Sequence, residues 1–155
     1  MPKNAIDQRL KDLGLELPNP AAPAANYIPY TIAGKLLTIS GQIPMGPDGP
    51  QYIGKLGDDA DVAFGRSAAR LCAVNILAQA RAALGSLDKV KQVIKIQGFV
   101  NATPDFTQHP EVINGASDLL VDVLGDAGKH ARAAVGMSSL PRGVAVEVDA
   151  VIEMT

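Results

Sequence analysis

The feature that most restricts the fold of this sequence is a strict alternation of residue types near its C-terminus. Every second residue from position 144 to 152 is apolar: Val144, Val146, Val148, Ala150 and Ile152. Glu147 and Asp149 stand between them. Successive side chains of a β-strand point to opposite faces, so the pattern predicts a strand with one buried face. The rest of the chain must then supply elements that cover this face.

Two segments of helical periodicity can provide the cover. Residues 59–84 carry apolar side chains at helical spacing and end before Gly85, and residues 110–124 start at Pro110 and end before Gly125. Proline is favoured in the first turn of a helix and glycine just past its end. Both segments are therefore predicted as helices, with a shorter helix over residues 4–13.

Three more segments are predicted as strands. Residues 27–44 read as two strands joined at residues 33–35, residues 89–102 as one long strand, and residues 131–137 as another. This order predicts an α+β fold, a two-layer sandwich of one mixed β-sheet with two helices on one face. A single domain is expected over residues 26–155, preceded in residues 1–25 by the N-terminal helix and a Pro/Ala linker.

Arg132 stands among the small and apolar residues of the strand 131–137. The last two strands can pair antiparallel with their apolar sets together, which predicts a mixed face away from the helices. That face would carry His130, Arg132, Ala134, Gly136, Phe99, Glu147 and Asp149. Such a face suits a wall shared between subunits. The planar guanidinium of Arg132 matches a carboxylate ligand there; the alternative is a cross-strand ion pair with Glu147 or Asp149.

Composition disfavours several classes of protein. The net charge is −2 and aromatic residues make up 4% of the 155 residues, so neither a basic patch nor a base-stacking surface for nucleic acid is expected. No apolar run of roughly 20 residues and no signal-peptide core are present, so we expect a cytoplasmic protein without a membrane partner.

Cysteine and histidine give little sign of metal chemistry. Cys72 is the single cysteine and lies in an apolar helical run, which favours a core thiol. His109 and His130 have no partner at metal-ligand spacing, so no metal site is expected. For His130 we expect a structural role, with participation in the Arg132 site as the alternative.

Three segments carry a family resemblance: TISGQIP (38–44), VIKIQGFVNATPDF (93–106) and ARAAVGMSSLPRGVAVEVDAVI (131–152). In them the sequence resembles the RidA/YjgF group of reactive-intermediate (enamine/imine) deaminases, a family also named for endoribonuclease. The third segment is the most specific, with an arginine, a short strand, LP, a glycine turn and VEV. The resemblance spans about residues 27–152. The N-terminal extension looks like the longer bacterial branch of the family.

The resemblance implies a chorismate-mutase-like fold and a homotrimer. In that arrangement the sheets line a central barrel, the helices lie outside, and a site sits in each subunit interface. No metal or organic cofactor is implied. The expected partner is a small metabolite that carries a carboxylate.

The resemblance also assigns roles to residues of this chain. Arg132 is similar to the arginine that binds the substrate carboxylate, and Glu147 to the glutamate that positions water. Tyr27 is a further catalytic candidate, while Ser40, Gly41 and Asn114 fall on substrate-binding positions. Ala134 stands where many deaminases have a cysteine, which makes the expected pocket smaller and less polar. Ala134 and Phe99 complete the set of expected pocket residues.

These assignments predict hydrolysis of small 2-imino or enamine acids to 2-keto acids and ammonia, as in 2-iminobutanoate/2-iminopropanoate deaminases. The alternative is a trimer that binds a small carboxylate as a sensor or scavenger without turnover, which Ala134 favours. Endoribonuclease activity is a third interpretation. It is disfavoured because the sequence shows no basic patch, no stacking aromatics and no histidine pair suited to acid–base cleavage.

Overall fold

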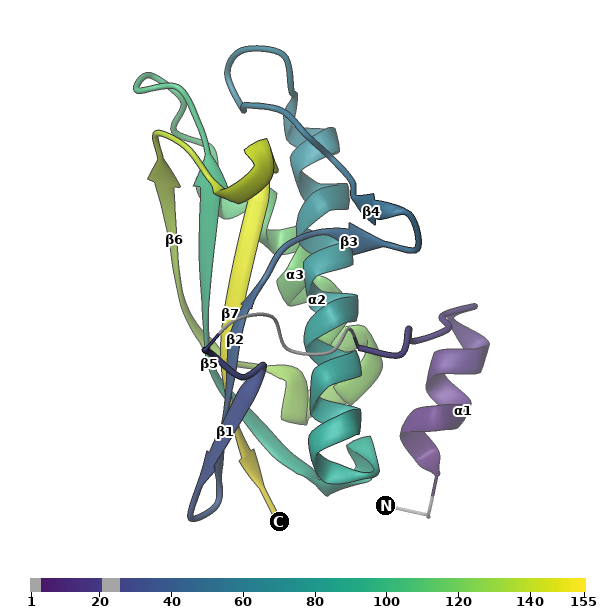
Figure 1. Ribbon diagram of the computed structural model, residues 1–155. Helices are drawn as coiled ribbons and strands as arrows, with labels where there is room; N and C mark the ends of the chain where they lie inside the picture. The colour runs from purple at the N-terminus through teal and green to yellow at the C-terminus, as the bar shows by residue number, and fades with distance from the viewer. Residues whose placement is uncertain (1–3, 21–25) are drawn as a thin grey trace.

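The computed structural model describes residues 4–20 and 26–155, which form a sheet covered on one face by helices (Figure 1). The strands in spatial order are β1 (Tyr30–Ala33), β2 (Leu36–Gln42), β7 (Val146–Met154), β5 (Val90–Asn101) and β6 (Ala131–Met137). Helices α2 (Val62–Leu84) and α3 (His109–Leu124) cover the sheet. The β5–β6 pair is parallel and the other pairs are antiparallel. The predicted α+β sandwich with one mixed sheet is confirmed.

The helix ends follow local capping chemistry. The carboxylate of Asp61 accepts a hydrogen bond from the Phe64 amide at 2.8 Å, so α2 begins three residues later than the apolar pattern predicts. Gly85 ends α2 with a φ of +78°, a conformation that favours glycine. The small elements are β3 (Met45–Gly46), β4 (Gly49–Pro50) and the 3₁₀ turns η1 (Leu87–Lys89), η2 (Gly125–Gly128) and η3 (Pro141–Gly143).

Helix α1 (Ala5–Asp12) lies outside the two covering helices, on the side away from the sheet (Figure 1). Its Ile6 and Leu10 are buried in the common core. Arg9 Nη1 donates to the Val123 carbonyl at 3.0 Å, which ties α1 to α3. Residues 21–25 of the predicted Pro/Ala linker lie outside the described residues, and the division of the chain at residue 25 stays a prediction.

The predicted antiparallel pairing of the last two strands is wrong. β6 pairs in parallel with β5 at the edge of the sheet, whereas β7 lies between β5 and β2. The connection through η3 crosses the end of β5: the Asn101 amide donates to the Ala145 carbonyl and the Ala102 amide to the Met137 carbonyl, both within 3.0 Å. The long strand β5 therefore lies between β7 and β6. If β6 paired directly with β7, which already pairs with β2 on its other side, β5 could not lie between them.

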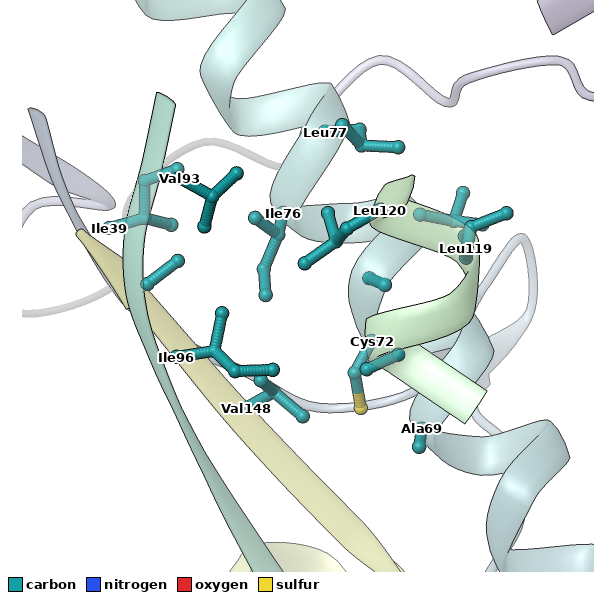
Figure 2. Packing of buried hydrophobic residues seen from close by; sticks show 14 of the residues in the cluster. Ile39, Ala69, Cys72, Ile76, Leu77, Val93, Ile96, Leu119, Leu120 and Val148 are labelled. Carbon is teal, nitrogen blue, oxygen red and sulfur yellow. The ribbon is translucent and has the colours of Figure 1, made fainter. Parts of the chain in front are cut away.

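The core lies between the sheet and the two covering helices (Figure 2). Figure 2 labels Ile39, Ala69, Cys72, Ile76, Leu77, Val93, Ile96, Leu119, Leu120 and Val148 from five of these elements. Cys72 is fully buried and its thiol lies 3.6 Å from the Val146 carbonyl. Burial raises the pKa of the Cys72 thiol, with a further contribution from the negative charge of Glu147. The prediction of a core thiol is thus confirmed.

Gly115 sets the distance between α2 and α3, and its replacement tests this packing. A Cβ at Gly115 would overlap the Arg66 carbonyl oxygen, which belongs to the α2 backbone. Gly115→Ala is therefore expected to destabilise the protein by about 1–3 kcal/mol, because a helix must shift to accept one methyl group. Urea unfolding at fixed protein concentration measures the change.

Gly65→Ala is the matched control for this prediction. A Cβ at Gly65 would meet side-chain methyl groups of Val112 at 3.0 Å and Leu56 at 3.1 Å, which can move. Alanine also favours the helix by roughly 1 kcal/mol over glycine, so Gly65→Ala should lie close to neutral. Equal destabilisation by both variants would contradict the assigned role of Gly115.

Candidate functional site

Arg132 lies on the helix-covered face of the sheet, not on the open face that the sequence predicted. The parallel register pairs Arg132 with Ile96, a fully buried residue that faces the helices. Paired residues share a face, so Arg132 points toward α3. The prediction failed because it assigned the more apolar residues of β6 to the core. Val135 from that set is instead 41% exposed on the open face.

Three acceptors on one side of α3 hold the Arg132 guanidinium. Nη1 donates to Asn114 Oδ1 at 2.8 Å and to Ser117 Oγ at 3.1 Å, and Nη2 donates to the Pro110 carbonyl at 3.2 Å. Positions 110, 114 and 117 follow helical spacing, which brings them onto one face. Arg132 and Asn114, both predicted as site residues, are therefore direct neighbours.

The guanidinium keeps two hydrogen-bond donors for other use. An arginine has five N–H groups, and three of them are used in these contacts. Within the described part of the chain, the Nε–H and one N–H of Nη2 have no protein acceptor. Nε and Nη2 form one edge of the planar group, and such an edge can bind both oxygens of a carboxylate.

All three acceptors of Arg132 are neutral. Among the described residues, 4–20 and 26–155, no carboxylate lies within ion-pair distance of Arg132. The alternative that Arg132 pairs with Glu147 or Asp149 across the strands is therefore wrong. In the part of the chain that the structure describes, no ion pair compensates the positive charge of Arg132, which leaves it available to an anionic ligand.

Ser117 and His130 complete the surroundings of Arg132. His130 Nε2 lies 2.8 Å from Ser117 Oγ, and His130 Nδ1 lies 2.6 Å from the Gly128 carbonyl. His130 was expected on the open face and instead packs toward α3, like Arg132. Sequence reasoning missed Ser117, although its position three residues after Asn114 was a signal that it shares that helix face.

Ala134 and Gly136 also face the helices, which corrects their predicted place on the open face. In the parallel register Ala134 pairs with Gly98, and a Cβ at Gly98 would overlap Ile113 of α3. A Cβ at Gly136 would lie 2.6 Å from His109 Nε2, so the absence of a side chain makes room for that imidazole. The helix-covered side of β6 thus carries Arg132, Ala134 and Gly136 in a row, with His109 at one end.

Glu147 belongs to a second group of predicted residues, centred on a β-bulge in β2. Ile39 pairs with Ala150 and Gln42 with Val148, so Ser40 and Gly41 together oppose Asp149. A Cβ at Gly41 would overlap Glu147 Oε1. Glycine at this position therefore lets the Glu147 carboxylate lie directly against the backbone of β2.

Glu147 and Asp149 of β7 are half-buried on the open face. Burial raises the pKa of Glu147, and the negative charge of Asp149 raises it further. Burial also raises the pKa of Asp149, although a backbone hydrogen bond from Gln97 and the charge of Lys95 oppose this. A raised pKa makes a carboxylate a stronger base, and it is one of the features that mark groups used in proton transfer.

Phe99 and Tyr27 are the two remaining predicted site residues. Phe99 pairs with Glu147 in the β5–β7 register and shares the open face with it, as predicted. Ser40 Oγ donates to the Ile28 carbonyl at 2.8 Å, which holds the segment containing Tyr27 beside β2. The Tyr27 side chain is 62% exposed.

The predicted site residues therefore fall into two groups within one chain. The arginine group consists of Arg132, Asn114 and Ala134 at the helix-covered side of the edge strand. The glutamate group contains Glu147 and Phe99 on the open face, with Ser40 and Gly41 in the adjacent bulge of β2. Tyr27 lies in the segment before β1. Because the sheet separates Arg132 from Glu147, a small molecule bound to one cannot reach the other in the same chain.

The remaining surface depression and the search for metal ligands add no residue to the candidate site. An open depression of about 470 Å³ lies at the start of α2, lined by residues that include Gly57, Asp61 and Phe106, and it contains no predicted site residue. Among the described residues, no cluster of three or more His, Cys, Asp or Glu side chains could hold a metal ion. No helix in the described ranges is long and apolar enough to cross a membrane.

Solved structures resemble this chain over nearly its whole length. A protein of unknown function from Agrobacterium tumefaciens is 52% identical, with a TM-score of 0.91 over 98% of this chain and 95% of that one. A "putative endoribonuclease" from Shewanella oneidensis is 38% identical, with a TM-score of 0.93 over 97% of this chain and 100% of that one.

Sequence comparisons agree with the structural ones. The chain is 49% identical to Protein TCP17 of Trypanosoma cruzi over 150 residues, which are 96% of this chain and 94% of that protein. Residues 7–151 match a family model described as "YjgF/chorismate_mutase-like, putative endoribonuclease". The fold is that of the same family, as the resemblance implied. The chain therefore belongs to the YjgF/RidA family, with its chorismate-mutase-like fold.

Proposed function

We propose that the protein hydrolyses small 2-imino acids to 2-keto acids and ammonia. The observation that carries this proposal is the state of Arg132: neutral acceptors on α3 hold the guanidinium, and among the described residues its Nε and Nη2 each keep an N–H without an acceptor. A fixed positive charge with an open bidentate edge suits the carboxylate that every 2-imino acid carries.

Arg132 would orient the substrate rather than react with it. Once both carboxylate oxygens are bound, the adjacent C=N carbon is held at a defined distance and angle from the protein. Such positioning lowers the entropic barrier for attack by water. Ala134 lies beside Arg132 on the same face and packs partly buried against the core.

Glu147 would move the protons of the reaction. The carboxylate accepts a proton from water while the water oxygen bonds to the carbon of the protonated imine, which gives a neutral tetrahedral amino alcohol. The carboxylic acid then returns that proton to the nitrogen. As the C–N bond breaks, the carboxylate takes the hydroxyl proton, the C=O bond of the 2-keto acid forms, and ammonia leaves and takes up the proton from the carboxylic acid. The raised pKa of Glu147 supports both steps, because it makes the carboxylate a stronger base and brings its pKa closer to neutral.

The reaction needs two copies of the chain, because Arg132 and Glu147 lie on opposite sides of one sheet. We infer a homotrimer in which the arginine group of one protomer meets the glutamate group of the next. The mixed open face supports this inference: Leu36 and Val135 are more than 40% exposed there, beside the half-buried Glu147 and Asp149.

The endoribonuclease function in the names of relatives has less support here. Both nitrogens of His130 already make hydrogen bonds within the chain, so this imidazole is a poor proton donor or acceptor for RNA. The alternative of a carboxylate sensor uses the same Arg132 contacts. It differs only in whether an imine is turned over.

The first test is release of keto acid from freshly generated 2-iminobutyrate and 2-iminopropionate. The wild-type protein is expected to accelerate release over the spontaneous rate. If the protein binds 2-oxobutyrate but does not accelerate release of keto acid, the sensor function is favoured over the hydrolase function.

Mixing two inactive variants tests whether the site spans two subunits. Arg132→Ala and Glu147→Gln protomers, unfolded together and refolded at equal ratio, should recover activity in about a quarter of the sites, since each site takes one residue from each neighbour. Each variant refolded alone is the control. No recovery despite normal trimers in sedimentation would contradict the shared site.

A further inference from the structure

A chain of three hydrogen bonds lies behind Arg132 and ends at a backbone carbonyl. It runs from Arg132 Nη1 to Ser117 Oγ over 3.1 Å, from Ser117 Oγ to His130 Nε2 over 2.8 Å, and from His130 Nδ1 to the Gly128 carbonyl over 2.6 Å. The chain connects β6, α3 and η2, which are three separate elements. The proposed reaction does not use Ser117 or His130 directly.

The direction of each hydrogen bond follows from its partners. A carbonyl oxygen only accepts, so His130 Nδ1 must carry a proton toward Gly128. In a neutral imidazole Nε2 then has a lone pair, and it accepts the hydroxyl proton of Ser117. The lone pairs of Ser117 Oγ are thereby left to accept the N–H of Arg132. Each of these three hydrogen bonds thus has one donor and one acceptor.

His130 matters because the hydroxyl of a helical serine has an alternative hydrogen-bond acceptor. A serine hydroxyl in a helix can donate to a carbonyl of the preceding turn, which changes where its lone pairs point. The His130 acceptor holds the proton of Ser117 on one side and so keeps its lone pairs toward Arg132.

We propose that Ser117 and His130 are positioning residues that hold Arg132 with its Nε and Nη2 edge open to a carboxylate. They set the affinity for the substrate carboxylate and leave the chemical step to other groups. The identity of the carboxylate rests on the function proposed above, whereas the hydrogen-bond chain stands on the contacts within this protein.

Steady-state kinetics on 2-iminobutyrate separate positioning from chemistry. Ser117→Ala removes an acceptor of the charged guanidinium and should raise KM about tenfold, with kcat changed less than about twofold. Ser117→Thr keeps the hydroxyl and should return KM to within about threefold of wild type. A large fall in kcat at unchanged KM would overturn the positioning role.

Coupling between the two residues is a second signature. His130→Ala should raise KM by about threefold in the wild-type background, because Ser117 Oγ is still present but no longer oriented. In the Ser117→Ala background the same change should have no further effect on KM, because the hydrogen bonds that connect His130 to Arg132 through Ser117 are already lost. Additive effects would contradict the proposal. Asp118→Asn, which removes the α3 partner of Arg66 instead, is the matched control and should leave KM unchanged.

A measurement without ligand distinguishes this proposal from the proposed reaction. The chain has two histidines, so ¹⁵N NMR can assign the His130 tautomer, which should be protonated at Nδ1 only. Rotation of the Arg132 guanidinium should be slow in wild type and faster in Ser117→Ala. A proton on Nε2 alone, or unchanged rotation, overturns the proposal.

Binding of 2-oxobutyrate then shows whether the hydrolase function alone fails or the positioning role fails with it. If wild type binds this keto acid and Ser117→Ala weakens binding, while no imine is turned over, the hydrolase fails and the positioning role stands. If wild type neither binds 2-oxobutyrate nor turns over an imine, both proposals are overturned.

Discussion

Arg132→Ala is expected to lower kcat/KM for 2-iminobutyrate by about 10²–10⁴-fold. Two charge-assisted hydrogen bonds to the carboxylate disappear, each worth about 1.5–3 kcal/mol, and each 1.4 kcal/mol corresponds to about a factor of ten. The side chain is only partly buried and makes no ion pair within the described residues, so the fold should survive. Keto-acid release measured over a range of imine concentrations gives the ratio.

Two further variants show what the arginine contributes. Arg132→Lys keeps the positive charge but loses the planar pair of donors, so most of the activity should still be lost. Arg66→Ala removes a different arginine, which pairs with Asp118 at 3.1 Å on the exposed side of α2 and α3, and should leave kcat/KM unchanged. Full activity of Arg132→Ala would remove the basis of the proposed function.

Glu147→Gln is expected to lower kcat by at least about 100-fold while KM changes little. Glutamine fills the same space against Gly41 but cannot accept and return a proton, and general acid–base catalysis typically contributes about 10²–10⁴-fold. Glu153→Gln on the same strand is the matched control, because Glu153 pairs with Lys91 at 2.8 Å, far from the bulge. Normal turnover by Glu147→Gln would assign the proton transfers to another group.

The same variant should alter how stability depends on pH. The pKa of Glu147 is raised above its ordinary value of 4.5, mainly by burial, so the folded protein retains this proton to higher pH than the unfolded chain does. Stability therefore falls as pH rises from about 4.5 through the folded pKa. Glu147→Gln should remove that part of the loss and become more stable relative to wild type across this window. Urea unfolding at several pH values and one protomer concentration measures the difference.

The fold was largely predictable because its elements carry strong local signals. The alternation at 144–152, the two helical runs and their glycine ends predicted the layers of the sandwich. Short-range chemistry such as the Asp61 cap shifted one helix end by three residues without altering the architecture. Likewise, the buried thiol of Cys72 followed from its apolar surroundings in the sequence.

The arrangement around Arg132 was predictable only in part. Family resemblance suggested that Asn114 and Arg132 belong to one site, and they are in contact. The support from Ser117 and His130 was not predicted, because it depends on how α3 lies over β6. Serine and histidine at these positions show no spacing rule that would connect them across 13 residues.

What the sequence by itself determined is which segments form helices and strands, since periodicity and capping act within a few residues. Only the tertiary structure decided which strands are neighbours. β6 pairs with β5 rather than β7, and its register places Arg132 opposite the buried Ile96, on the helix-covered face. In an edge strand of small residues both faces are similarly apolar, so local pattern cannot select one. The contacts of Arg132 with α3, and its separation from Glu147 by the sheet, follow from that packing.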